Sequence, residues 1–79
     1  MAVTVRLFAA ARSAAGVSEV QVNPGTLSQV QAQLIDSHPT LAQVLPQCSY
    51  LLNEISCSDS SADVADSSTL DVLPPFAGG

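Results

Sequence analysis

Alternating hydrophobic and polar positions open the chain and predict a half-buried β-strand. Residues 3–8 alternate and are rich in β-branched side chains, which pack well on a pleated surface. We expect one apolar face, which carries Val3, Val5 and Leu7. The opposite face is mixed and carries Thr4, Arg6 and Phe8. Residues 9–16 are mostly alanine and predict a short helical turn that ends at Gly16.

A second strand and a turn precede the main helix. Residues 18–22 predict the strand, with Val20 and Val22 pointing the same way. The turn covers residues 23–25, where proline presets φ and Gly25 is expected to supply a positive φ.

The main helix is marked at both ends. Thr26, followed three residues later by Gln29, matches the capping box, in which the two side chains satisfy backbone N–H groups at a helix start. Apolar residues then recur at helical spacing, namely Leu27, Val30, Leu34 and Ile35. We expect the helix to run to about Ser37, because Pro39 disfavours helical backbone at His38.

The elements that follow the main helix are shorter. The apolar residues within 41–45 predict one more helical turn, which stops at Pro46. Residues 50–52 and 55–57 flank the pair Asn53-Glu54 and predict a tight hairpin, although this pair lacks the glycine that such turns favour.

The rest of the chain completes an α+β pattern. Residues 56–68 are biased towards serine, aspartate and alanine, and they predict a surface loop anchored by Val64. Residues 69–73 predict a last strand, with apolar residues on either side of Asp71. Two strands, a capped amphipathic helix and further strands indicate an α+β domain with the helix across one face of a sheet.

Composition and charge narrow the class of protein. Its 79 residues suffice for one small domain, and 47% hydrophobic against 11% charged residues exclude a charge-driven disordered chain. The chain carries seven acidic residues, two arginines and no lysine, for a net charge of −5. Nucleic acid and anionic membrane surfaces are excluded as partners, because both need clustered basic residues. Basic protein surfaces are favoured, and no internal side-chain amine can accept an isopeptide bond.

Cysteine usage and the first residues indicate a cytoplasmic protein. No apolar run approaches the roughly 20 residues of a membrane span, and the N-terminus does not resemble a signal peptide. Cys48 and Cys57 lack zinc-ligand spacing, so we expect no metal site. We expect reduced thiols that pack as small, buried or half-buried hydrophobic side chains, with a disulfide or redox role as the alternative.

The candidate chemistry lies at the C-terminus. We divide the chain into a domain, residues 1–73, and an extended tail, residues 74–79. The tail begins with two prolines, which cannot extend a sheet and favour a polyproline conformation that holds the tail away from the body. When extended, its six residues reach about 20 Å.

The two final glycines make the terminal carboxylate the reactive group of the tail. Gly78 and Gly79 have no side chains, so they can thread a narrow channel and approach a partner closely. A carboxylate is a poor electrophile, but after adenylation sulfur or an amine can attack it. The alternative is an inert, flexible end.

The pattern over essentially the whole chain resembles a known family. It consists of the opening strand with its continuation Phe8-Ala9-Ala10-Ala11-Arg12, the capped helix from Thr26, and the ending from Leu70 to Gly79. These segments resemble the MoaD/ThiS group of sulfur carriers, which are ubiquitin-like β-grasp proteins, and within it the small subunits of molybdopterin synthase. One departure is that Ser67 and Ser68 stand where the family usually has Gly-Asp, so the turn there must be built differently.

The resemblance implies a mixed sheet with one main helix packed across it, and a role as the small subunit of molybdopterin synthase. Gly79 would be adenylated by an ATP-using enzyme similar to ubiquitin-activating enzymes, then converted to a thiocarboxylate. Inserted into a pocket of the large subunit, it would donate sulfur to the cyclic pyranopterin monophosphate precursor of the molybdenum cofactor. The residues that would position the tail are Pro74, Pro75, Phe76, Ala77 and Gly78. We expect no bound cofactor.

An exposed apolar patch is the expected partner interface. Phe8 and Leu73 lie on the outer sheet face if the apolar positions of their strands face the helix, and Phe76 extends the patch. The alternative is a partly covered Phe8 that meets no partner. The free chain is expected to be a monomer, and the family implies a heterotetramer of two small and two large subunits.

The remaining polar and aromatic residues indicate no catalytic group. Arg6 and Arg12 are expected to be solvated surface residues, with pairing to carboxylates of a partner as the alternative, and the acidic residues are expected mostly to form a solvated face. We expect His38 to end the helix and Tyr50 to pack at a strand edge. The sequence contains no catalytic dyad, nucleophile–base pair or phosphate loop, so we expect the chain to catalyse nothing alone.

Three other functions stay open. The chain could carry sulfur for thiamine thiazole or cysteine synthesis, although the paired prolines favour the molybdopterin branch. It could be a ubiquitin-like modifier that ends as an amide on a lysine. It could also be a ubiquitin-like binding module with an idle tail.

Overall fold

Five strands form the main sheet in the computed structural model, which describes residues 2–75. In spatial order they are β2 (Glu19–Val22), β1 (Val3–Leu7), β7 (Thr69–Leu73), β4 (Ser49–Leu52) and β5 (Ile55–Ser56). β1 and β7 are parallel, and every other neighbouring pair is antiparallel. The sheet is therefore mixed, and its two parallel strands come from opposite ends of the chain.

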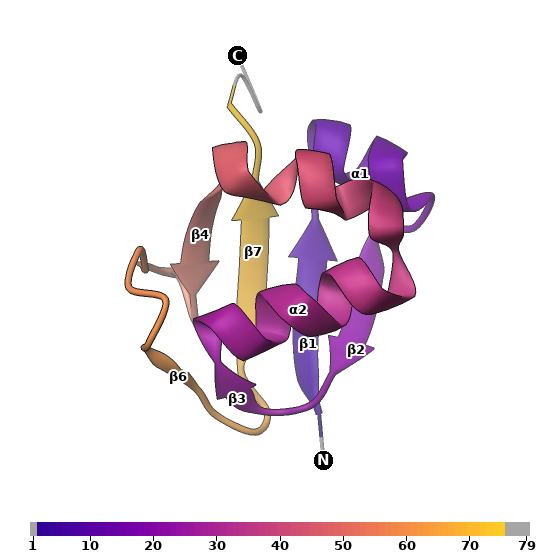
Figure 1. Cartoon of the computed structure of the whole chain (residues 1–79). Helices are drawn as coiled ribbons and strands as arrows, with labels where there is room; N and C mark the ends of the chain where they lie inside the picture. The colour runs from indigo at the N-terminus through magenta and orange to yellow at the C-terminus, as the bar shows by residue number, and fades with distance from the viewer. Residues whose placement is uncertain (1, 76–79) are drawn as a thin grey trace.

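Helices cover one face of this sheet. They are α1 (Ala9–Ala15), α2 (Leu27–Ser37) and two 3-10 helices, η1 (Pro39–Gln43) and η2 (Leu45–Gln47). In Figure 1, α2 crosses in front of the strands, and the 3-10 helices run above it towards the end where β7 leads into the tail. None of the helices within residues 2–75 is long and apolar enough to cross a membrane. The α+β arrangement with one main helix across the sheet is confirmed.

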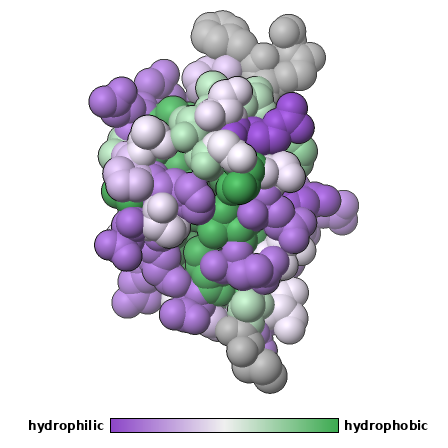
Figure 2. Space-filling view, turned by 90° about the vertical axis from the view of Figure 1, so that its right-hand side faces the viewer, coloured by the Kyte–Doolittle hydropathy of each residue, from purple (hydrophilic) through white to green (hydrophobic). Residues whose placement is uncertain are grey.

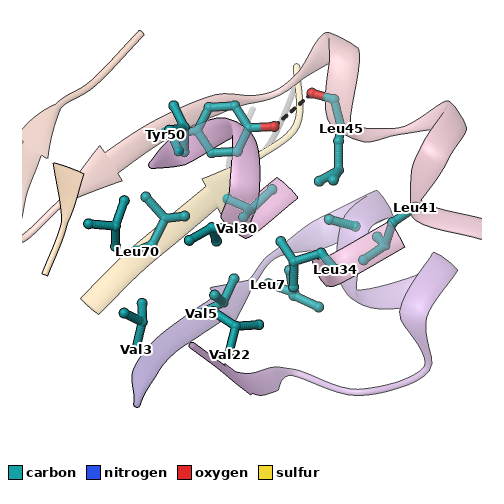
Figure 3. Close-up of a cluster of buried hydrophobic side chains, with 14 residues drawn as sticks. Val3, Val5, Leu7, Val22, Val30, Leu34, Leu41, Leu45, Tyr50 and Leu70 are labelled. Carbon is teal, nitrogen blue, oxygen red and sulfur yellow. Dashed lines mark hydrogen bonds between the residues drawn. The ribbon is translucent and has the colours of Figure 1, made fainter. Parts of the chain in front are cut away.

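The hydrophobic core lies between α2 and the sheet. On β1 the predicted alternation is confirmed, since Val3, Val5 and Leu7 are buried while Arg6 is exposed on the other face. From α2, the buried residues are Leu27, Val30 and Leu34. Figure 3 shows side chains from both layers meeting in this cluster. Figure 2, which faces the β2 side of the molecule, shows a stripe of hydrophobic residues between hydrophilic ones.

The start of α2 confirms the capping box and corrects the role of Gly25. The Thr26 hydroxyl accepts a hydrogen bond from Gln29 N at 3.2 Å, and Gln29 Oε1 accepts one from Thr26 N at 2.9 Å. Gly25 has no positive φ and instead belongs to β3 (Gly25–Thr26). A Cβ on Gly25 would lie 2.5 Å from Gln29 Oε1, so a larger residue there would displace the side chain that caps the helix.

The chain after α2 forms two short helices where one turn was predicted. The backbone N–H of His38 still caps α2 by donating to Leu34 O, and Pro39 opens η1. Pro46 lies inside η2 and does not stop the helical segment. Proline lacks a backbone N–H, but the N–H groups in the first turn of a helix have no partner within the helix, so nothing is lost there.

Tyr50 is a core residue, and its predicted place at a strand edge was wrong. β4 lies between β7 and β5, and the side chain of Tyr50 points into the core with 7% of the residue exposed. Its hydroxyl donates to the Leu45 carbonyl at 2.9 Å, as Figure 3 shows. The hydrogen bond satisfies the polar end of a buried ring, which is how tyrosine is tolerated in a core.

The predicted loop over residues 56–68 is anchored at Val64 as expected, although Ser56 belongs to β5. Within it, β6 (Asp63–Val64) pairs with β3 in a second, two-stranded sheet, and Val64 is buried.

Ser67 adopts a left-handed conformation with φ of 67°, where the family pattern has a glycine. The side chain of Asn53 bridges to this turn, since its Oδ1 accepts from Thr69 N at 2.9 Å and its Nδ2 donates to Ser68 Oγ at 3.3 Å. These contacts explain how the turn before β7 is built without Gly-Asp.

The β4–β5 hairpin is confirmed, and its turn is the reason for the first stability prediction. Asn53 and Glu54 both have positive φ, at 50° and 70°, which is the signature of a two-residue hairpin turn that favours Asn-Gly. Because a left-handed backbone is costly for a residue with a Cβ, Glu54→Gly should raise the free energy of unfolding by about 0.5–1 kcal/mol in urea denaturation.

The matched control is Glu54→Ala, which removes the same carboxylate but keeps the Cβ. It should show no comparable gain in stability. A glycine variant no more stable than the alanine variant would contradict the assignment of strain to this position.

Candidate functional site at the root of the C-terminal tail

The candidate tail continues directly from the strand at the centre of the sheet. β7 is hydrogen bonded to β1 on one side and to β4 on the other, and it ends at Leu73. Pro74 is buried and Pro75 is exposed. The first residue of the predicted tail is therefore packed, because a residue that continues a central strand lies between the residues that continue its neighbours. The predicted roles of Phe76, Ala77, Gly78 and Gly79 lie outside the described residues.

Two apolar side chains lie beside the root of the tail, as predicted. Leu7 is paired with Val72 in the register of β1 and β7, so Phe8 and Leu73 occupy the next positions and share the outer face. Phe8 is 36% exposed, and Leu73 is half-buried. We call Phe8 and Leu73 the apolar pair. The third predicted member of this patch, Phe76, lies outside the described residues.

An ion pair occupies the same face one row further from the tail. Arg6 Nε lies 2.6 Å from Asp71 Oδ1, and Arg6 Nη2 lies 2.8 Å from Asp71 Oδ2. The side chain of Asp71 is 9% exposed and that of Arg6 is 46% exposed. The hydrogen bonds from Arg6 to Asp71, with the attraction between the charges, raise the pKa of Arg6 above its ordinary value. Asp71 is therefore an exception to the expected solvated face, while Arg6 is exposed as expected but is paired within the chain.

The sequence predicts the face on which each member of this ion pair lies, but not that the two residues meet. Arg6 and Asp71 both stand at polar positions of alternating strands, so each could be assigned to the outer face. Their contact depends on the register that pairs Arg6 with Asp71, across 65 residues of chain. Single-strand patterns carry no register between distant strands, which is why the pair was missed.

A polar hollow of about 300 Å³ lies next to the ion pair. It is lined by Arg6 and Asp71 together with Asn53, Glu54 and Thr69.

The backbone that connects β1 to α1 holds Phe8 at the edge of this face. Phe8 precedes α1 in an extended conformation, and Ala9 has a positive φ of 49°. Gly16 ends α1 with φ of 76°, which confirms the predicted glycine stop. Arg12 lies on α1 and is exposed, as expected for a solvated residue.

The two cysteines are half-buried free thiols, as predicted. Both line a cavity of about 210 Å³, together with Tyr50 and with Leu27 and Gln31 of the N-terminal part of α2. Burial raises the pKa of the Cys48 thiol, and Cys48 Sγ lies 3.2 Å from the Val44 carbonyl oxygen. Within residues 2–75, no three side chains of His, Cys, Asp or Glu are grouped so that they could hold a metal ion.

Comparison with known proteins identifies the family. The model of the ThiS family matches residues 5–79. The chain belongs to the ThiS family. This is the group of sulfur carriers that the sequence resembled, and the match extends through the tail. A molybdopterin synthase sulfur carrier subunit from Chlamydomonas reinhardtii is 32% identical to this ThiS-family chain over 84 residues, with 100% of both chains covered.

Solved structures confirm the ubiquitin-like β-grasp fold of this ThiS-family member. The crystal structure of SAMP1 from Haloferax volcanii superposes with a TM-score of 0.86 at 23% identity, covering 100% of both chains. The small archaeal modifier protein 1 from Methanosarcina acetivorans gives a TM-score of 0.86 at 26% identity, over 99% of this chain and 96% of its own.

A third solved structure is a complex of two subunits. It contains subunits 1 and 2 of the molybdopterin-converting factor from Helicobacter pylori, and the matching chain gives a TM-score of 0.76 at 24% identity, with 100% of both chains covered.

The environment of Cys48 leads to a prediction about pH. Only the thiolate reacts with alkylating agents, and a raised pKa lowers the thiolate fraction at any pH below it. In a Cys57→Ser variant, Cys48 should therefore react with iodoacetamide at pH 8 at least about threefold more slowly than N-acetylcysteine.

Unfolding the same variant in urea should remove the difference, because the burial is lost. Mass spectrometry of samples quenched over time measures both rates. Equal rates in the folded protein and the model thiol would contradict the stated environment of Cys48.

Proposed function

We propose that this chain is the sulfur-carrier small subunit of a molybdopterin synthase. Gly79 is first adenylated, when its carboxylate attacks the α-phosphate of ATP and pyrophosphate leaves. A sulfide donor then displaces AMP and leaves a thiocarboxylate. The thiocarboxylate donates its sulfur to the cyclic pyranopterin monophosphate precursor. The observation that carries this proposal is the full-length match to a molybdopterin synthase sulfur carrier subunit, together with the Pro-Pro-Phe-Ala-Gly-Gly ending.

The structure supports a division of labour between two subunits. The chain has a net charge of −5 and two arginines, one of which is engaged by Asp71. It therefore has little positive charge to offer a phosphorylated pterin. The large subunit supplies the cations and the pocket, and an adenylyltransferase similar to ubiquitin-activating enzymes supplies the ATP chemistry.

The root of the tail suits the delivery of a group into a pocket. Ordering the tail residues on a partner costs about 1–2 kcal/mol for each residue in backbone entropy. Contacts made by the domain must offset that cost. The apolar pair, Phe8 and Leu73, lies next to the strand from which the tail leaves, so it is placed to contact whichever protein holds the tail.

The first test is an intact-mass measurement. The chain is incubated with ATP, a sulfide source and the cognate activating enzyme, and fragmentation then locates any exchange of sulfur for oxygen. We expect the exchange at Gly79, because an activated terminal carboxyl is the group that the pathway modifies. Fragmentation is needed because oxidation of Met1 or a cysteine changes the mass almost equally.

The outcomes separate the candidate functions. Deletion of Gly79 should abolish the mass gain and the sulfur transfer while leaving the fold intact. Transfer only to a thiazole-forming or cysteine-forming enzyme would identify another carrier branch, and an amide bond to a lysine of another protein would identify a modifier. No modification, with an activating enzyme proven on another carrier, would favour a binding module.

The second test concerns the apolar pair. Phe8→Asp introduces a charge at a residue that is already 36% exposed, so the unfolding temperature should change little. Binding to the large subunit should weaken by about tenfold or more, because an aromatic contact is replaced by a charge that must be desolvated. Calorimetric titration measures the affinity. Wild-type affinity in the variant would remove Phe8 from the interface.

A further inference from the structure

A row of charged side chains crosses the outer face of the sheet. In the registers of β2 with β1 and of β1 with β7, Glu19 lies opposite Arg6 and Arg6 lies opposite Asp71. We call these three residues the ionic row. It lies between the apolar pair at the root of the tail and a row of uncharged polar residues, where Thr4 and Gln21 are hydrogen bonded side chain to side chain. The outer face is therefore graded from apolar to ionic to polar.

Arg6 is held rigidly within the ionic row, yet it keeps donors free for a partner. Its two hydrogen bonds to Asp71 use the Nε and Nη2 atoms, and its guanidinium carbon lies 6.0 Å from the centroid of the Phe8 ring. A guanidinium has five N–H donors, so three are left over from the contacts with Asp71. With its side chain 46% exposed, Arg6 presents a preorganised fork to any surface placed on the sheet.

Sheet stability alone gives little reason for an ion pair at this place. Cross-strand pairs of β-branched or aromatic residues stabilise a sheet at least as well as opposite charges do. Arginine and aromatic residues are, by contrast, enriched in protein interfaces, and arginine is enriched among the residues that carry most of the binding energy. The geometry therefore favours recognition as the role of Arg6.

We infer that Arg6 recognises a carboxylate on the large subunit of the synthase, and that a basic side chain of that subunit faces Glu19. A carboxylate matches the remaining guanidinium donors in shape and charge. The basic neighbour follows from the exposed Glu19 at the end of the ionic row and from the net charge of −5. Because Asp71 already orients the guanidinium, binding orders one long side chain fewer. This inference rests on the proposed function, which supplies the identity of the partner.

A charge swap separates recognition from stability. In the double variant Arg6→Asp with Asp71→Arg, an ion pair between β1 and β7 is retained, but the guanidinium moves by one strand. We expect the double variant to fold with a lowered unfolding temperature, because the carboxylate introduced at position 6 lies opposite Glu19 in the register of β1 with β2, so binding is measured at a temperature where the variant is folded. We expect the Kd for the large subunit from the same organism to rise by about tenfold or more in calorimetric titration.

Arg6→Lys is the second variant, in case the swap fails to fold. It keeps the positive charge next to Asp71 but loses the planar fork, so the Kd should rise by about fivefold or more. The matched control is Arg12→Ala, which removes the chain's other arginine, on α1, and should change the Kd by less than about threefold.

Two results would overturn the inference. The first is a Kd within about threefold of the wild type for a folded swap variant or for Arg6→Lys. This would show that the partner does not recognise the planar guanidinium of Arg6. A loss in Arg12→Ala equal to that in Arg6→Lys would show that the loss of affinity is not specific to the Arg6 guanidinium.

Failure of the proposed function looks different from failure of this inference. In that case the wild-type chain itself would acquire no thiocarboxylate and would not bind the large subunit. A wild-type chain that is thiocarboxylated and binds, together with variants that bind equally well, would overturn the role of Arg6 alone.

Discussion

The parallel pairing of β1 with β7 is the constraint on which the rest of the structure depends. It joins Thr4 to Thr69 and Leu7 to Val72, so the two parallel strands of the sheet come from opposite ends of the chain. This single register buries the inner faces of both strands beneath α2, brings Arg6 to Asp71 and sets Phe8 beside Leu73. Such a pairing closes almost the whole chain into a loop. The conformational entropy lost by this closure is offset only when the hydrophobic core forms at the same time.

Features that depend on neighbouring residues could be predicted from the sequence. The capping box at Thr26 and Gln29, the glycine stop at Gly16 and the alternation in β1 all rest on contacts within a few residues, and all three are confirmed. The hairpin at Asn53-Glu54 was also correct without a glycine: Asn53 adopts left-handed backbone readily, and Glu54 is held there at a cost by the pairing of the flanking strands. The ending of the chain indicated the family for the same reason, as a continuous motif.

Features that depend on distant pairing could not be predicted. The ion pair of Arg6 with Asp71, the inward position of Tyr50 and the bridge from Asn53 to the turn before β7 all need a strand register that no local pattern encodes. Gly25 illustrates a different limit. A glycine in a turn suggests a positive φ, whereas Gly25 has none and instead leaves room for the capping side chain of Gln29.

The position of β7 also determines how the molecule responds to force. The tail continues a strand that is hydrogen bonded along both sides, to β1 and to β4 (Figure 1). A pull along the tail acts along both ladders in shear. Hydrogen bonds loaded in shear share the force, while those at a peeling edge break one after another. Because β7 is bonded on both sides, a pull on the tail has to load both ladders together before β7 can leave the sheet.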